Sequence, residues 1–345
     1  MDYSQILSQQ FNIKEEYAKN IITLLDDGNT IPFIARYRKE MHGSMDDQLI
    51  REFAEKLEYL RGLDKRRDEI RSLIDAQEKL TDEINLALDK AATLSELEDI
   101  YRPYRPKRKT RASIAKEKGL EPLANDILKQ EKGFDPSKSA VDYIDEEKGV
   151  TSVEDAIQGA MDIIAELVSD NAEIRKRIRN LTNANGVLVS VATDEEKDSV
   201  YKNYYDYKEP VKKIAGHRVL AVNRGEKEGF LKVSVETDSE KPLNSIFRAM
   251  ITDKNQLCSD IIREACTDAY QRLIYPSIER EVRNDLTDTA SENAMKVFAV
   301  NLKQLLMQPP VKGKTVLALD PGYRTGCKTA VVDSTGKVLD TTVIY

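Results

Sequence analysis

Apolar residues recur every three or four positions up to about residue 181, the period of helices that bury one face. In the first 60 residues, Asn12 with Glu15 and Ser44 with Asp47 predict two helix starts, because short polar side chains cap the N–H groups of a first turn. Gly28 predicts a helix end between them. The apolar side chains expected to face inward here are Ala18, Ile21, Ile22, Leu25, Leu49, Phe53, Leu57 and Leu60.

A second helical stretch is expected from Thr81 to about Leu181. Thr151 with Glu154 predicts the start of an amphipathic helix in this stretch, and Asp170 with Glu173 predicts the start of the next. The inward positions of the first are Ile157, Ala160, Met161, Ile164 and Leu167, and the second carries Arg175, Lys176, Arg177 and Arg179.

The period then changes to that of half-buried strands. Residues 186–193 are rich in Val and Leu, and apolar residues alternate with polar ones over residues 230–235. Residues 219–222 and 230–235 flank the turn Asn-Arg-Gly-Glu-Lys-Glu-Gly, as the two strands of a hairpin would. This pattern predicts a small β insert in a helical protein.

Helices are expected again from about Asn255, with a break at Tyr275-Pro276 and an end at Pro309-Pro310, because proline lacks the N–H that continues a helix. The last 35 residues contain three strand-like segments, at 316–320, 329–333 and 338–343. Such a meander leaves one edge unpaired, which predicts an incomplete domain. The expected organisation is therefore 1–60, 61–184, 185–240, 241–310 and 311–345.

Composition narrows the class of protein. Charged residues make up 33% of the 345 residues, and a formal net charge of −7 argues against a protein that coats nucleic acid over its whole surface. Screening limits the reach of a charge to about 10 Å, so a local basic patch is still compatible with binding. The N-terminus has no signal-peptide pattern, no apolar run could span a membrane, and the three cysteines and two histidines match no zinc pattern. We therefore expect a cytoplasmic protein with free thiols and no metal.

Five segments carry a family resemblance. They are LLDDGNTIPFIARYRKE (24–40), LEDIYRPYRPKRKTRASIAKEKGLEPLA (97–124), HRVLAVNRGEKEGFLKV (217–233), YPSIEREVR (275–283) and VLALDPGYRTGCKTAVVD (316–333). Together, and in this order, they resemble the Tex family of bacterial transcription accessory proteins. The last segment resembles the opening of the family's YqgF, or ribonuclease-H-like, domain.

The resemblance implies a mainly α, multi-domain fold. Its parts are a helical N-terminal region with a helix-turn-helix-like unit, a small β insert, long central helices and a truncated α/β ribonuclease-H-like domain. It also implies a nucleic-acid-binding scaffold near the transcription or translation machinery, with RNA favoured over DNA and RNA polymerase or ribosome-associated factors as partners. No enzymatic activity, cofactor, membrane or small-molecule substrate is expected. The family's later helix-hairpin-helix motifs and OB-fold RNA-binding domain are absent from this sequence.

A dense basic run is the first candidate site. Its cations are Arg102, Arg105, Lys107, Arg108, Lys109, Arg111, Lys116 and Lys118, opposed within the run by Glu117. Tyr101 and Tyr104 lie among them, and two prolines stiffen the segment. Guanidinium and ammonium groups attract phosphates, and four such contacts predict a slope of roughly −3 to −4 in log affinity against log salt. The alternative is a solvated loop, or a segment that pairs with the chain's own carboxylates.

The helix-turn-helix-like region is the second candidate. Arg36, Arg38 and Lys39 could contact nucleic acid, but the neighbouring Phe33 and Tyr37 suggest a core or interface. We favour a structural role, with these cations paired to Asp26, Asp27 or Glu40.

Asp320 is the third candidate, in a nuclease or junction-resolvase alternative. It ends a strand where ribonuclease-H-like nucleases hold a divalent metal, but metal-dependent cleavage needs several converging carboxylates. Asp333 is a possible companion, although an Asp before Ser-Thr-Gly is more often a turn residue. Gly313 to Thr315 lack the earlier glycine of a phosphate loop. We therefore favour nucleic-acid binding over catalysis. A helical adaptor that binds only protein is the third hypothesis.

Overall fold

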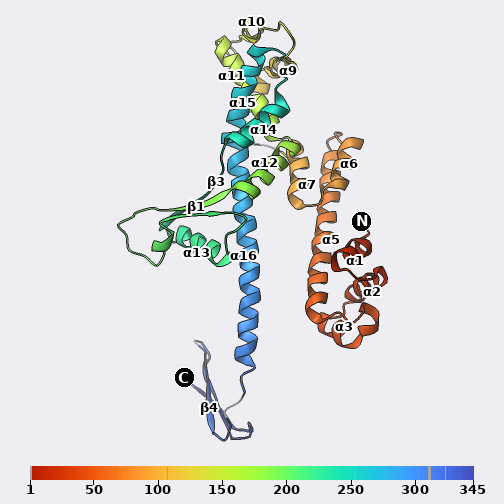
Figure 1. Ribbon diagram of the computed structural model, residues 1–345, viewed down its shortest axis with the longest axis vertical. Helices are drawn as coiled ribbons and strands as arrows, with labels where there is room; N and C mark the ends of the chain where they lie inside the picture. Colours follow the sequence, from red (N-terminus) through yellow and green to blue (C-terminus); the bar gives the residue numbers. More distant parts are fainter. Residues whose placement is uncertain (1, 107, 253, 310–311, 323) are drawn as a thin grey trace. The chain divides into compact units, whose positions relative to one another are not determined.

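The structure is a computed structural model that describes residues 2–106, 108–252, 254–309, 312–322 and 324–345 (Figure 1). The chain forms two units, which are described separately below. The first comprises Met1–Val191, Asp206–Lys213 and Val233–Arg283, and the second comprises Ala192–Tyr205, Ile214–Lys232 and Asn284–Tyr345.

The N-terminal helices pack along one long helix. They are α1 (Tyr3–Phe11), α2 (Glu15–Asp26), α3 (Ile31–Tyr37), α4 (Lys39–His42) and the long α5 (Asp47–Asp75). Their shared core contains Leu7, Ile21, Ile34, Ile50 and Phe53, all of them fully buried. The helical spacing of the sequence predicted Ala18, Ile21, Phe53, Leu57 and Leu60 of this core but missed Leu7, Leu24 and Ile50.

All four expected helix starts are wrong in detail. Ser152, not Thr151, caps the helix Val153–Ser169, and Asn171, not Asp170, caps the helix Ala172–Asn185. Asn12 ends α1 in a left-handed conformation with φ 52°, and α2 begins without a side-chain cap. Asparagine tolerates this conformation, so the same residue type occurs at both ends of helices. Asp46, not Ser44, caps α5 by accepting a hydrogen bond from the N–H of Leu49. Leu49 is consequently 41% exposed and Ile50 takes the inward position.

The middle of the first unit is built around α11. Its helices are α6 (Asp82–Lys90), α7 (Leu94–Tyr101), α8 (Arg111–Glu117), α9 (Glu121–Lys129), α10 (Pro136–Ala140), α11 (Val153–Ser169) and α12 (Ala172–Asn185). Helix α11 contacts α8 and α9, and its Ala160, Met161 and Ile164 are buried as expected. Leu167 is 46% exposed, contrary to expectation, and Val168 lies inward beside it.

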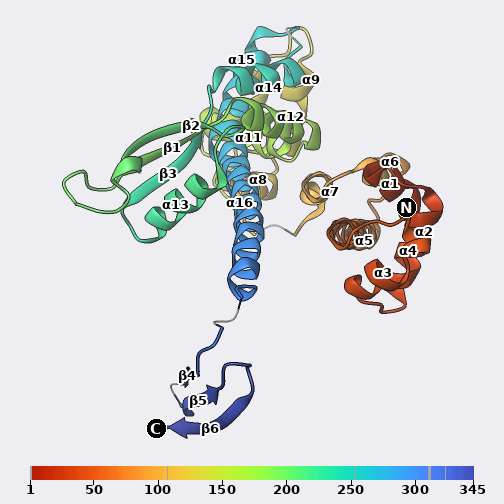
Figure 2. The same cartoon turned by 60° about the horizontal axis from the view of Figure 1, so that its bottom comes forward.

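The β insert is a three-stranded sheet with the order β2-β1-β3 (Figure 2). Strands β1 (Val187–Ala192) and β3 (Leu231–Glu236) confirm two of the predicted segments, and β2 (Asp206–Pro210) was missed. Strand β2 pairs antiparallel with β1, from Val187 opposite Pro210 to Val191 opposite Asp206.

The strand expected at 219–222 is wrong, because these residues lie in helix α13 (Gly216–Lys227). Val219 and Val222 are both buried and three positions apart, a spacing that suits one face of a helix. Gly225 lets this helix approach the next strand, since a Cβ there would lie 2.5 Å from Leu231 Cδ1. A segment of four residues is too short to distinguish the period of a helix from that of a strand.

The expected helix break at Tyr275-Pro276 is also wrong. After α14 (Glu240–Met250), helix α15 (Gln256–Asp268) continues through a π-helical segment, Ala269–Ile274, into α16 (Tyr275–Leu306). The wider π turn accommodates Pro276, whose ring and missing N–H would disturb a regular α-helical turn. The helix is thus continuous where a break was predicted.

The C-terminal strands confirm the predicted meander. Strands β4 (Val316–Gly322), β5 (Gly326–Val332) and β6 (Val338–Ile344) form an antiparallel sheet in chain order. The mainly α, multi-domain fold with small three-stranded sheets is therefore confirmed. No helix in the described ranges combines the length and apolar character that crossing a membrane requires.

Candidate nucleic-acid interface

The predicted basic run changes structure along its length. Arg102 begins a 3-10 turn, Arg102–Tyr104, and a loop leads from there to α8. Thr110 caps α8 by accepting from the N–H of Ser113, and the Ser113 hydroxyl accepts from the N–H of Thr110 in return. The stiff loop therefore ends at Thr110, and the later cations of the run lie on or just after a helix. Lys107 lies outside the described residues.

Carboxylates of the chain already pair with several of these cations. Arg105 Nη2 lies 2.5 Å from Glu98 Oε2, while its guanidinium lies over the buried Tyr101 ring. Lys109 Nζ lies 3.6 Å from Glu117 Oε2. Both cations remain more than half exposed, so water screens these pairs and they hold the side chains weakly. A phosphate could replace such partners.

The two last lysines of the run are held more locally. Lys116 Nζ lies 2.9 Å from Glu121 Oε1, and Lys118 Nζ donates to the backbone oxygen of Gly149 at 2.7 Å. The bond from Lys118 joins the end of α8 to a turn 31 residues later. These contacts give both lysines a structural use.

Arg108 and Arg111 are the most available cations of the run. Both are exposed, and neither has an ion pair with another residue of the described ranges. Arg108 and Lys109 line a cleft of about 330 Å³ together with Arg102 and Arg105. The structure thus brings four cations of the predicted run to one hollow.

Arg102 has a different environment from the rest of the run. Its Nε lies 3.3 Å from Asp170 Oδ1, although the orientation does not make a hydrogen bond. Burial, followed by the positive charge of Arg175, lowers the pKa of the Arg102 guanidinium, and Asp170 opposes this shift. Arg102 is thus a partly buried cation beside a second one.

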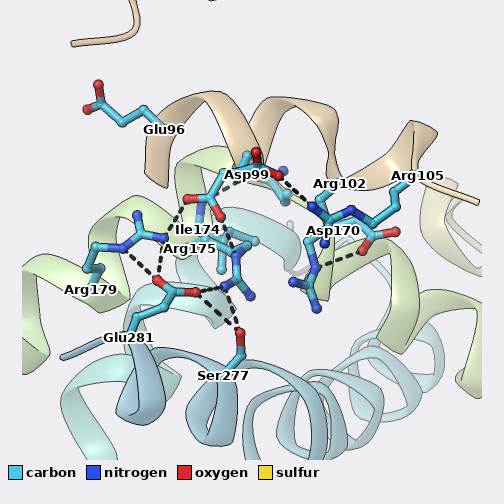
Figure 3. A network of polar contacts seen from close by, with 12 residues as sticks. Glu96, Asp99, Arg102, Arg105, Asp170, Ile174, Arg175, Arg179, Ser277 and Glu281 are labelled. Atoms are coloured by element: carbon cyan, nitrogen blue, oxygen red, sulfur yellow. Dashed lines mark hydrogen bonds and ion pairs between the residues drawn. The ribbon is translucent and has the colours of Figure 1, made fainter. Parts of the chain in front are cut away.

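That second cation belongs to a buried network that the sequence did not reveal as a site. Arg175, on α12, is 1% exposed. Its Nε donates to Asp99 Oδ1 of α7 at 2.6 Å, and its Nη2 donates to Glu281 Oε1 of α16 at 2.7 Å and to Ser277 Oγ at 3.1 Å (Figure 3). One guanidinium thereby joins three helices.

Arg179 completes the network one turn further along α12. Its Nε and Nη2 donate to Glu281 Oε2 at 2.9 and 2.8 Å, and Nη2 lies 2.8 Å from Asp99 Oδ2. This last contact has the distance of an ion pair but not hydrogen-bond geometry. Burial opposes the charged form, yet the charges of Asp99 and Glu281 raise the pKa of Arg179. Two arginines and two acids are therefore held together by ion pairs as one compact group.

The arginines of the N-terminal helices do not form a comparable site. Arg38 lies over the Phe33 ring at 5.0 Å, and Tyr37 is 62% exposed. Asp26 does not pair with this group as expected, because it forms two hydrogen bonds with Arg61 of α5, at 2.7 and 2.8 Å.

The metal-site candidates are not assembled in the described ranges. Asp320 lies in β4 opposite Lys328 of β5, and no group of three or more possible ligand residues occurs in the part of the chain that the structure describes. Asp333 accepts from the N–H groups of Thr335 and Lys337, and the Thr335 hydroxyl is the first cause that lowers its pKa. The turn interpretation of Asp333 is therefore confirmed. Burial raises the pKa of the Cys266 thiol to about 12, which leaves it unreactive.

Comparison with protein families gives three matches in chain order. Residues 1–75 match a Tex-like protein N-terminal domain, residues 131–298 match a Tex central region-like model, and residues 314–345 match a Tex protein YqgF-like domain.

Curated relatives match over the whole length of the chain. Protein YdcI of Bacillus subtilis is 46% identical over all of this chain and 49% of its own length. Transcriptional accessory protein Tex of Neisseria gonorrhoeae is 38% identical over all of this chain and 46% of its own length. Human S1 RNA-binding domain-containing protein 1 is 32% identical over all of this chain and 36% of its own length. The chain thus spans half or less of the length of these relatives.

Proposed function

The chain belongs to the Tex family, and on that premise we propose that it binds nucleic acid as part of a transcription accessory protein. RNA is the favoured ligand, because relatives such as the human protein are named for an S1 RNA-binding domain. RNA polymerase or ribosome-associated factors are the proposed protein partners, which would place the chain in the cytoplasm.

One observation carries this proposal: Arg102, Arg105, Arg108 and Lys109 line a common cleft. Backbone phosphates would enter here, where Arg108 is free of ion pairs to other described residues and Lys109 has only a weak, exposed one. Arginine suits this task because its planar guanidinium can donate two parallel hydrogen bonds to a phosphate. The chain's acidic total does not prevent this, since distant charges are screened.

The proposed role is binding without catalysis. Asp320 is the carboxylate that the ribonuclease-H-like resemblance would use, and it faces Lys328 across the sheet. The relatives are named as accessory and RNA-binding proteins, not as enzymes. We therefore assign no reaction to this chain.

A charge-reversal pair tests the proposal. Arg108→Glu combined with Lys109→Glu should weaken binding to a fluorescent single-stranded polyuridine RNA by about tenfold or more, measured by anisotropy. The slope of log affinity against log salt should become shallower by about 1.4, because two phosphate contacts are lost.

The matched control reverses the same charges elsewhere. Lys241→Glu combined with Arg248→Glu changes an exposed lysine and an exposed arginine on α14, away from the cleft. This control should change the affinity for the RNA by less than about twofold, because salt screens charges that lie far from the cleft. Equal affinity for both double variants would refute the proposed interface.

A further inference from the structure

The cleft of the basic run shares lining residues with a larger cleft. The larger cleft has a volume of about 710 Å³ and shares Arg102, Arg105 and Leu273 with the smaller cleft. It lies among α7, α12 and the segment from the π turn into α16, all within the first unit. Arg102 and Arg105 therefore border both clefts, with Arg108 and Lys109 lining the smaller one and Arg280 lining the larger one.

Positive charge is in excess along the walls of the larger cleft. Six arginines line it, against the three carboxylates of Glu98, Asp99 and Glu281. The residues are Arg102, Arg105, Arg175, Arg179, Arg272 and Arg280. Behind the lining, Asp170 lies beside Arg102, and Asp162 and Asp268 pair with Arg272. Three acids thus lie behind the lining, and the lining itself holds twice as many arginines as carboxylates.

Arg280 is an exposed cation of this cleft. It lies on α16 one position before Glu281, which anchors the buried network. Its side chain is exposed and has no ion pair among the residues that the structure describes. The network fixes the backbone beside Arg280 and leaves its guanidinium available.

Two buried nitrogen atoms in the cleft have hydrogens without acceptors. Arg175 Nη1 and Arg102 Nε are inaccessible to solvent and have no hydrogen-bond partner among the described residues. The ends of these two side chains lie next to each other (Figure 3). Carboxylates lie near both groups, because Asp170 Oδ1 is 3.3 Å from Arg102 Nε, and Asp99 and Glu281 accept from the other nitrogens of Arg175. The two guanidinium groups therefore keep hydrogen-bonding capacity that these carboxylates leave unused, which favours an anion in the adjoining cleft.

We propose that the larger cleft binds a backbone phosphate of single-stranded nucleic acid, with Arg102, Arg105 and Arg280 as the contacting cations. This inference rests on the proposed function and deepens it. The strand held by Arg108 and Lys109 in the smaller cleft continues past Arg102 and Arg105 into the larger cleft. Arg175 is a positioning residue that fixes the three helices and adds its charge from behind. A cleft of this volume has room for one nucleotide of a single strand, whose base is free to enter, whereas the bases of a duplex are paired inside its helix.

Substitution of Arg280 tests the inference separately from the basic run. Arg280→Glu should weaken binding of single-stranded polyuridine RNA by about tenfold and make the salt slope shallower by about 0.7, the value for one phosphate contact. Arg280→Lys keeps the charge but loses the two-pronged geometry, so it should retain an intermediate affinity. Arg177→Glu is the control, since Arg177 is an exposed arginine on α12 outside the cleft.

The outcomes separate the two proposals. If Arg280→Glu binds within about twofold of the original chain while the Arg108/Lys109 pair loses binding, the cleft inference is wrong and the proposed function stands. If neither variant loses affinity, both are wrong. Duplex RNA of the same length should bind more weakly and should not respond to Arg280→Glu, and an equal loss on both ligands would overturn the single-strand assignment. If Arg280→Glu unfolds at the same temperature as the original chain, a loss of RNA affinity arises from the changed charge and not from a damaged fold.

Discussion

The basic loop and the arginine network place the same residue type in opposite conditions. Arg105 and Arg108 stand in solvent, with one weak carboxylate partner or none among the described residues. Arg175 and Arg179 are withdrawn from solvent and share Asp99 and Glu281 between them. An exposed guanidinium is free to bind a ligand, whereas a buried one is committed to its protein partners. The difference separates arginines that recognise a ligand from arginines that support them.

The two regions also depend on each other. Asp99 and Arg102 lie three residues apart, at the end of α7 and the start of the following turn. The ion pairs of Asp99 therefore fix the point from which the basic loop departs. A rigid support beneath a solvated loop limits the entropy that binding must remove.

The largest effect is expected from breaking the network. Asp99→Ala leaves two buried guanidinium groups short of a partner, so the free energy of unfolding should fall by about 3–5 kcal/mol in urea denaturation. Glu264→Ala, which removes an exposed acid of α15, should change it by less than about 0.5 kcal/mol. A loss below about 1 kcal/mol for Asp99→Ala would show that the network is not the support described here.

A smaller effect on RNA binding should distinguish the available cations of the basic run from those that the protein already holds. Arg108→Gln removes an available cation and should raise the dissociation constant for polyuridine RNA about threefold to tenfold. Lys118→Gln removes a cation whose ammonium group is already bonded to Gly149 O, so its effect should stay within about twofold. Equal losses in the two variants would mean that charge density, and not local availability, determines binding.

A still weaker effect is expected from an exposed ion pair between α7 and α12, the helices that carry Asp99 and Arg175. Lys176 on α12 lies 2.7 Å from Glu96 on α7, and its hydrogen bond is the first cause that lowers the pKa of Glu96. A lowered carboxyl pKa stabilises the fold above the ordinary value of 4.5, and this contribution is lost as the pH falls through the lower folded value.

Lys176→Met should therefore reduce the free energy of unfolding by less than about 1 kcal/mol near pH 7, because half of the lysine side chain is exposed. The two proteins should become equally stable at a pH below the lowered pKa of Glu96, where that carboxyl is protonated. Urea titrations at both pH values measure this, and a difference that persists in acid would assign the loss to packing of the lysine stem.

No change is expected from Asp320→Asn. Incubated with Mg²⁺ or Mn²⁺ and labelled single strands, duplexes or four-way junctions, the chain and this variant should both leave the nucleic acid intact, because one carboxylate holds a divalent metal weakly. Cleavage that disappears in Asp320→Asn would revive the nuclease alternative.

Local patterns predicted most of the elements. The stripe of Phe53, Leu57 and Leu60 identified the buried face of α5, and the three C-terminal strands appear where the alternation placed them. Errors occurred where one signal serves two structures. Asn12 could begin or end a helix, and residues 219–222 were too short to show a helical period. The π turn before Pro276 depends on contacts of the surrounding helices that no local rule contains.

By itself, the sequence determined the helical class, the family and the position of the basic run, because each of these depends on residues that are close together in the chain. The tertiary structure decided which cations are available. Asp99, Arg175 and Glu281 are separated by 76 and 106 residues, and only the packing of α7, α12 and α16 brings them together. Burial then determines whether an arginine is paired inside or open to a ligand, since the cost of removing a charge from water depends on where the fold places it.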